Sequence, residues 1–316
     1  MKSIYKFFLF FSVLLLQNSC AQNSKEKKTM ITKEQYNSIS KEVKKYDYNP
    51  TYQLKVNTNL CTYEIYINDM LVDFSFTTGR TAGEQNIDIP QYILKSGIQS
   101  VRYIVYPKAI KNGILEEFVD YDAEFSLRIV HGEYYKTQFK DFIEDYRTTS
   151  LKIEDDIQSI EKEEKFTAKV PYELEGWSKG VDLSKEEPIK LEKEVLEKYN
   201  EFRDSFSNRD VTSIATMIYN REKEIAQAFF FDSERRGNYN NGWKELEEKC
   251  NAIIEMKPID NYSMKILGNG KIVCLLKNEG KLRNFPVVYG TTGEKLRFYG
   301  LFFYRPSPGA KLEIIR

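Results

Sequence analysis

Hydrophobic and polar residues alternate along much of the stretch from residue 50 to residue 147, which is the pattern of half-buried β-strands. The clearest example is a pair of apolar runs, 63–67 and 70–76, separated by the turn dipeptide Asn68-Asp69. Further strand-like runs cover residues 52–56, 99–107 and 122–130, and a weaker one covers 138–143. Several short strands separated by turns predict an antiparallel β-sandwich domain over residues 49–147.

The segment that follows, residues 148–188, breaks this alternation. Charged residues crowd 154–156 and 161–165. Proline and glycine punctuate the rest, at Pro171, Gly176, Gly180 and Pro188. We therefore predict that residues 148–188 form a linker.

From residue 189 onward, apolar residues recur at spacings of three and four, which indicates amphipathic helices. The first stripe comprises Leu191, Val195, Tyr199, Phe202 and Phe206. Asp210 is expected to cap a second helix, and a third helix is predicted over residues 243–256. Strand-like runs follow at 262–267, 271–277, 285–289, 296–304 and 311–315. Helices followed by antiparallel strands predict an α+β domain over residues 189–316, so the chain is expected to be multidomain.

The first of these domains resembles jelly-roll domains of the galactose-binding-like class. The resemblance rests on the Asn68-led hairpin turn, on the corner formed by residues 89–93 with Gly97, and on the strand that ends at Pro107. It covers about sixty residues of the chain. Asp69 and Gln99 stand where that class usually has Gly and Asn. The corner residues are structural in that class, so the resemblance implies a fold and no ligand contact.

The second domain resembles nuclear-transport-factor-two-like domains, which are cone-shaped. The matching pattern is an aromatic helix face, a break, a capping Asp and an apolar residue, and it reads Tyr199, Phe202, Phe206, Asp210, Ile214. The resemblance implies a cone-like arrangement in which helices precede an antiparallel sheet. Enzymes of that class use Asp, Tyr or His in the cone, but no residue here can be assigned such a role.

The N-terminus has the organisation of a signal peptide. Lys2 and Lys6 precede an uncharged apolar run, 7–16, which is too short to cross a bilayer, and Ser19-Cys20 follows. This resembles the relaxed lipoboxes of Bacteroidetes lipoproteins, with Gln17 in the usual place of Leu. We predict a signal peptide over 1–19, a lipid on Cys20, and a lipidated tether over 20–48. Within that tether, residues 31–45 fit either a short helix or more tether, and an ordinary secretory signal is the alternative to the lipoprotein.

A lipid on Cys20 would place the protein in the bacterial cell envelope, anchored to the outer membrane on its periplasmic or its surface face. Lys plus Arg and Asp plus Glu both number 47, and this balance gives no support for nucleic-acid binding. The remaining cysteines are Cys61, Cys250 and Cys274. Cys250 and Cys274 could form a disulfide, but we favour three small buried apolar residues.

Residues that carry catalysis are sparse. His131 is the only histidine, and we place it at a strand end before Gly132. No nucleophile elbow, phosphate loop, zinc-protease or dinucleotide motif is present in the sequence. We therefore predict no enzyme, no catalytic residue, no metal and no cofactor.

Aromatic and amide side chains gather in one polar loop before the third helix. Tyr239, Asn240, Asn241 and Trp243 are the types that recognise sugars or proteins, and core packing at the helix start is the alternative. We accordingly predict a lipid-anchored, non-catalytic envelope binding protein, with another protein as partner. One version is an immunity lipoprotein that neutralises a delivered toxin. The rival hypothesis is a lipoprotein that binds or processes glycans.

Overall fold

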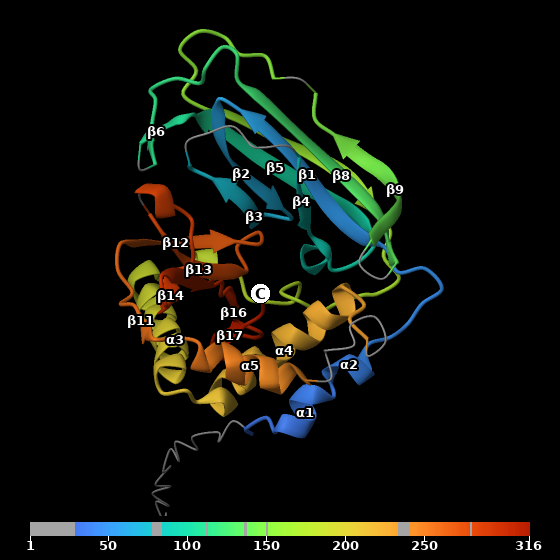
Figure 1. Ribbon diagram of the computed structural model, residues 1–316, viewed down its shortest axis with the longest axis vertical. Helices are drawn as coiled ribbons and strands as arrows, with labels where there is room; N and C mark the ends of the chain where they lie inside the picture. The colour runs from blue at the N-terminus through green and yellow to red at the C-terminus, as the bar shows by residue number, and fades with distance from the viewer. Residues whose placement is uncertain are drawn as a thin grey trace, which may run out of the picture.

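The computed structural model describes residues 29–77, 84–111, 113–135, 138–149, 151–232, 241–278 and 280–316. The described part has a β-rich mixed α/β fold in which all strand pairs are antiparallel. Two large sheets lie at one end of the molecule and the helices lie at the other (Figure 1). Among the described residues, none of the helices has the length and apolar character that a membrane span requires.

Two four-stranded sheets pack face to face in the N-terminal half. Sheet A has the order β4 (Gln85–Asp88), β1 (Thr51–Asn59), β8 (Glu124–Tyr135), β9 (Gln138–Arg147). Sheet B has the order β10 (Ile160–Ala168), β5 (Gly97–Pro107), β2 (Cys61–Ile67), β3 (Met70–Ser75). Leu54 and Ile129 of sheet A share one core with Ile65 and Val105 of sheet B. This arrangement is compatible with the predicted β-sandwich. A short turn, η1 (Pro90–Tyr92), and a small hairpin, β6 (Ala109–Lys111) with β7 (Ile114–Leu115), complete this half.

The predicted β2–β3 hairpin is confirmed, and its turn residues are structural. Asn68 and Asp69 have φ values of 51° and 60°, which a two-residue hairpin turn of the primed type requires. The Asn68 amide also donates to the Tyr92 carbonyl at 2.8 Å and accepts from the Ser100 backbone N–H at 3.1 Å. Asn68 therefore ties the turn to the corner that precedes β5.

The prediction of a linker over 148–188 is wrong for β10, which pairs with β5 along its whole length, from Ile160–Val105 to Ala168–Gly97. β10 is an edge strand, and only Phe166 and Ala168 are buried in it. The five residues 161–165 are charged and exposed, so the alternation that marks a strand is absent from the sequence. Downstream, Trp177 is also buried.

The C-terminal half places helices before strands, as predicted. The helices are α3 (Pro188–Ser207), α4 (Val211–Ala228) and α5 (Gly242–Asn251), and short turns lie at η2 (Leu183–Lys185) and η4 (Gly280–Leu282). The Asp210 carboxylate accepts from the Ser213 backbone N–H at 3.0 Å, which confirms the predicted cap of α4. The third helix is shorter than predicted, because residues 255–256 form strand β11.

Two small sheets follow these helices. The first has the order β11 (Glu255–Met256), β14 (Val288–Thr292), β15 (Lys295–Tyr299). The second has the order β12 (Tyr262–Leu267), β13 (Ile272–Lys277), β16 (Phe303–Tyr304), β17 (Glu313–Ile314). β13 is buried on both faces: Val273 and Leu275 join the core of the helices, whereas Cys274 packs with Met70 of sheet B. The layers therefore run from sheet A through sheet B and the β13 sheet to the helices. The finer cone-like arrangement stays a prediction.

The predicted tether over 20–48 is wrong for two short helices, α1 (Lys33–Asn37) and α2 (Ile39–Glu42). Tyr36 and Ile39 are buried in the core of the helical region. The Ile31 backbone N–H donates to the Thr216 hydroxyl of α4 at 3.0 Å. For these residues the helix alternative holds, because their apolar side chains, too sparse to form a face in the sequence, still pack into one core with α4 and α5.

Candidate functional site

The predicted contact loop is only partly described. Tyr239, Asn240 and the predicted lipid attachment residue Cys20 lie outside the described residues. Asn241 is the exposed N-cap of α5, and its side chain forms no capping hydrogen bond.

Trp243 belongs to the core, as the alternative interpretation of this loop had it. It is 7% exposed, and its ring meets Tyr36 edge-on with the centroids 6.1 Å apart. Its indole N–H donates to Glu247 at 2.7 Å, and its backbone N–H donates to the Asn37 side chain at 2.9 Å. In the described residues this side chain serves the docking of α1 on α5.

His131 lies within β8, so its predicted position at a strand end is wrong. Its Nδ1 lies 2.6 Å from the Asp145 carboxylate of β9, and its ring stacks on Tyr52 with the centroids 5.0 Å apart. β8 continues past Gly132 because that residue lets β9 approach: an added Cβ would lie 2.5 Å from the Lys140 carbonyl oxygen. The pair joins β8 to β9 within sheet A.

The three cysteines inside the described residues are free and buried, which confirms the favoured interpretation. Burial raises the pKa of the Cys61 thiol and of the Cys250 thiol to about 11 in each case. Burial also raises the pKa of the Cys274 thiol. Thiols held protonated in this way are poor nucleophiles at neutral pH.

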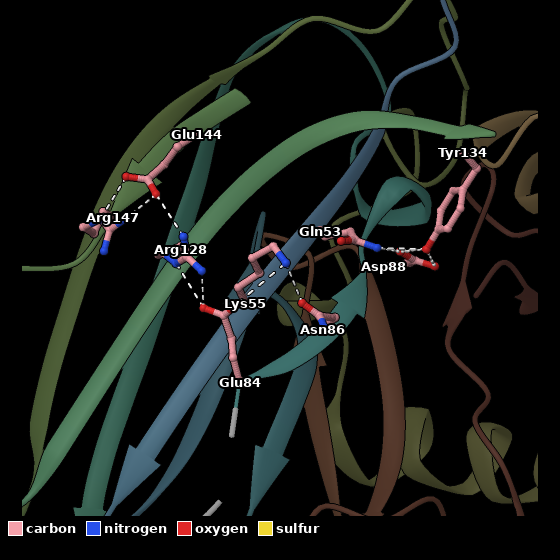
Figure 2. A network of polar contacts seen from close by, with 9 residues as sticks. All are labelled: Gln53, Lys55, Glu84, Asn86, Asp88, Arg128, Tyr134, Glu144 and Arg147. Atoms are coloured by element: carbon pink, nitrogen blue, oxygen red, sulfur yellow. Dashed lines mark hydrogen bonds and ion pairs between the residues drawn. The ribbon is translucent and has the colours of Figure 1, made fainter. Parts of the chain in front are cut away.

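A cluster that sequence reasoning missed lies on the outer face of sheet A, and we call it the outer polar face. Nine side chains form it: Gln53, Lys55, Glu84, Asn86, Asp88, Arg128, Tyr134, Glu144 and Arg147 (Figure 2). Leu54 and Ile129 point into the core, so their strand neighbours point outward. The strand register then places Lys55 between Asn86 and Arg128.

One end of the outer polar face is a partly buried hydrogen-bonded triad. The Gln53 amide is 5% exposed and donates to Asp88 at 2.8 Å and to the Tyr134 hydroxyl at 2.9 Å. Tyr134 in turn donates to Asp88 at 3.2 Å. Each of these polar groups fixes the other two, so the triad is rigid without a ligand.

The other end is a chain of alternating charges. Lys55 donates to the Asn86 side chain at 2.7 Å and lies 3.7 Å from Glu84. Arg128 connects Glu84 to Glu144. Arg147 donates to Glu144 at 2.8 Å, and this bond, followed by that of Arg128, lowers the pKa of the Glu144 carboxyl. The three cations and three carboxylates of the outer polar face therefore cancel.

The margins of this face are accessible. Phe142 is 55% exposed, and the Lys55 ammonium lies 5.5 Å from its ring centroid. Beyond Arg147 the surface opens into a hollow of about 520 Å³. Hydroxyl, amide and charged groups line this hollow together with apolar atoms, among them those of Asn57, Glu124, Ser126, Arg147 and Thr149.

The outer polar face is equipped for recognition. Donors and acceptors alternate across it, most are already held by neighbours, and one exposed aromatic ring, Phe142, lies at its edge. Alternation along β1 and β8 was visible in the sequence and predicts outward polar residues. Which of them meet was not visible, since Gln53, Asp88 and Tyr134 come from three strands far apart in the chain.

Comparisons with protein-family models, with curated proteins and with solved structures find no match to this chain. The jelly-roll and cone-like resemblances therefore stay predictions. Within the ranges that the structure describes, no group of three His, Cys, Asp or Glu side chains is placed to hold a metal ion.

Proposed function

We propose that this chain is a lipid-anchored, non-catalytic binding protein of the bacterial envelope, held to the membrane through Cys20. The observation that carries the binding role is the outer polar face, whose side chains are held in place by one another and flanked by the exposed Phe142. A surface that is rigid before binding loses little side-chain entropy when a ligand arrives. The pre-arranged side chains of the outer polar face therefore favour the binding of a ligand.

The electrostatics of the outer polar face support binding over turnover. A general acid that works near neutral pH needs a raised pKa, as burial away from cations provides. The Glu144 carboxyl has the opposite environment, because Arg147 and Arg128 lower its pKa. Glu84 likewise faces Arg128 and Lys55. These carboxylates are placed to orient cations and not to supply protons.

Another protein is the first candidate partner, and an immunity lipoprotein that neutralises a delivered toxin is one concrete version. Exposed aromatic and arginine side chains are the usual anchors of protein interfaces, and Phe142 and Arg147 stand at the margin of the outer polar face.

A glycan is the second candidate, and a specific observation favours it. The charges of the outer polar face cancel, and the adjoining hollow presents Asn57, Ser126 and Thr149. Every sugar hydroxyl both donates and accepts, so a neutral polyhydroxylated ligand suits a surface that offers both functions without net charge.

A photo-crosslinking experiment tests the proposal and separates the two partners. Phe142 is replaced by p-benzoylphenylalanine in the producing bacterium, and Ile189, 79% exposed at the start of α3, carries the same replacement as control. We expect adducts at position 142 that are absent at position 189, and mass spectrometry then identifies them as peptide or glycan. Equal labelling at both positions would contradict a binding role for this face. Catalytic release of product from envelope glycans by the purified protein would contradict the non-catalytic part.

A further inference from the structure

A ladder of four aromatic rings crosses from sheet B to the β14–β15 hairpin, on a part of the surface that the outer polar face does not include. Phe74 of β3 meets Phe285 with the centroids 5.1 Å apart. Phe285 meets Phe298 of β15 at 4.9 Å, and Phe298 stacks on Tyr289 of β14 at 5.1 Å. All four rings are partly exposed. Partly exposed aromatic side chains are typical anchors for a protein partner.

The ladder continues along the outer side of the β11–β14–β15 sheet. Tyr289 pairs with Phe298 across the two strands, and Thr291 pairs with Leu296. Successive residues of a strand point to opposite faces, so Leu296 lies on the same face as Phe298. Leu296 is 48% exposed. The outer side of β15 is therefore apolar and accessible.

β15 is also an edge strand. The sheet order ends with it, and no strand pairs with its other side in the part of the chain that the structure describes. Its first three residues are exposed. Such an edge presents backbone N–H and C=O groups that an additional strand can pair with.

The two remaining side chains of this stretch, Lys295 and Arg297, are cations. Lys295 and Arg297 alternate with Leu296 and Phe298, and neither forms an ion pair within the described residues. Nearby, Lys257 and Lys277 are both neutralised, by Glu255 and Asp260. Among the residues that the structure describes, Lys295 and Arg297 are therefore unpaired cations on the open edge, beside the one acidic residue of the β14–β15 hairpin, Glu294.

We propose that β15 is the docking edge for an extended segment of a protein partner, which adds as a further strand. Residues of that segment alternate between apolar side chains, which cover Leu296 and Phe298, and acidic ones, which face Lys295 and Arg297. Opposite charges and apolar pairs across neighbouring strands each stabilise a sheet, and this mode of recognition draws its affinity from the backbone. A second copy of the chain is disfavoured as occupant, because pairing β15 with itself would bring its cations together. The inference rests on the protein-binding form of the proposed function.

A labelled peptide tests this docking edge on the full mature chain. The peptide is seven residues long, with valine and phenylalanine alternating with glutamate, and the matched control peptide has lysine in place of glutamate. Fluorescence anisotropy should show saturable binding of the glutamate peptide and roughly tenfold weaker binding or none for the lysine peptide.

Charge reversal on the protein sharpens the test. Arg297→Glu should lower the affinity for the glutamate peptide by roughly tenfold and raise the affinity for the lysine peptide. Lys193→Glu, at an exposed position on α3, should change neither. Absence of binding to either peptide, or binding that Arg297→Glu leaves unchanged while circular dichroism shows a folded protein, would overturn the proposal. So would dimers in size-exclusion chromatography that Leu296→Lys dissociates, because the occupant would then be a second copy. Crosslinking at position 142 does not involve β15, so failure here leaves the proposed function open to its own test.

Discussion

Asn284 donates a 2.8 Å hydrogen bond to Glu64 across 220 residues of sequence, and it thereby joins the C-terminal half to sheet B. The Glu64 carboxylate is buried, with 5% of the residue exposed, and it also accepts from the Tyr66 hydroxyl at 2.7 Å. The guanidinium of Arg283 approaches the same carboxylate at 3.4 Å and lies 4.2 Å from the ring centroid of Phe76. Several donors therefore converge on one buried charge at the boundary between the halves.

We predict that Glu64→Ala lowers the free energy of unfolding by about 2–4 kcal/mol, because it leaves buried donors on Asn284 and Tyr66 without an acceptor. Urea denaturation measures the loss. The control is Glu161→Ala, whose carboxylate pairs with Arg102 at the surface, where a change below about 1 kcal/mol is expected. Equal losses in the two variants would show that the buried cluster contributes no more than a surface ion pair.

Trp243→Ala should destabilise the fold by about 3–5 kcal/mol, since a large buried side chain is deleted from contact with Tyr36. Thermal unfolding followed by circular dichroism gives the size of the effect. Tyr121→Ala, at an exposed position, is the control and should be nearly neutral. A Trp243→Ala protein as stable as the parent, with impaired partner capture, would restore Trp243 as a contact residue.

Acidification should weaken the fold through Glu194. Hydrogen bonds from Arg305 lower the pKa of this carboxyl from its ordinary 4.5. A group whose pKa is depressed on folding contributes stability above its unfolded value and loses that contribution as the pH falls through the folded value. The parent should therefore lose roughly 0.5–1 kcal/mol from this group as the pH falls below the ordinary value, after allowance for solvent screening.

Glu194→Gln should remove that part of the acid dependence, while Glu197→Gln, exposed on the same helix, should leave it intact. Denaturation midpoints measured between pH 7 and pH 3 compare the three proteins, with the lower limit set about one unit below the pKa values of carboxyl groups. Parallel pH profiles for all three would rule out the contribution of Glu194.

Limited trypsin digestion should cut at Lys152, which is exposed in the connection between β9 and β10, before it cuts within β10. Lys162 and Lys165 are exposed too, but they lie in β10, whose backbone is paired with β5, and a protease needs an unpaired segment. Mass spectrometry of early fragments identifies the sites. First cuts inside β10 would mean that this edge strand opens more readily than its pairing implies.

Cys20→Ala should abolish palmitate labelling, because it removes the predicted lipid attachment residue. It should also release the protein from membranes, because two or more acyl chains are needed for stable anchoring. Metabolic labelling followed by membrane fractionation measures both effects. The Cys61→Ala variant is the control, since that thiol is buried. Labelling that persists in Cys20→Ala would favour the ordinary secretory signal.

Local patterns in the sequence predicted the elements that depend on local causes. The β2–β3 hairpin follows from its Asn68-Asp69 turn, and α3 with its successor follows from apolar spacing and the Asp210 cap. β10 was missed because its exposed charges conceal a strand that only pairing with β5 reveals. α1 was left open for a similar reason, since its buried face exists only against α4 and α5.

The outer polar face could not be predicted from the sequence, for a different physical reason. Its members are ordinary outward residues of their own strands, and what distinguishes them is register, which brings Gln53 opposite Asp88 and Lys55 opposite Arg128. Register is set by tertiary packing of the inward residues and leaves no mark at the polar positions themselves. The predicted contact residue Trp243 was ambiguous for the opposite reason, since an aromatic residue at a helix start serves a surface and a core equally well.

The apolar layer in which Met70 and Tyr66 of sheet B pack with Cys274 of β13 has a consequence for avidity. It holds the outer polar face and the β15 edge at a fixed separation, without a flexible linker between them. A partner that reached both surfaces would make its second contact as an intramolecular event, at an effective concentration set by the protein's own geometry. Two individually weak contacts would then give the bound partner a long residence time. A partner whose two contact sites are spaced differently would gain no affinity from the second contact.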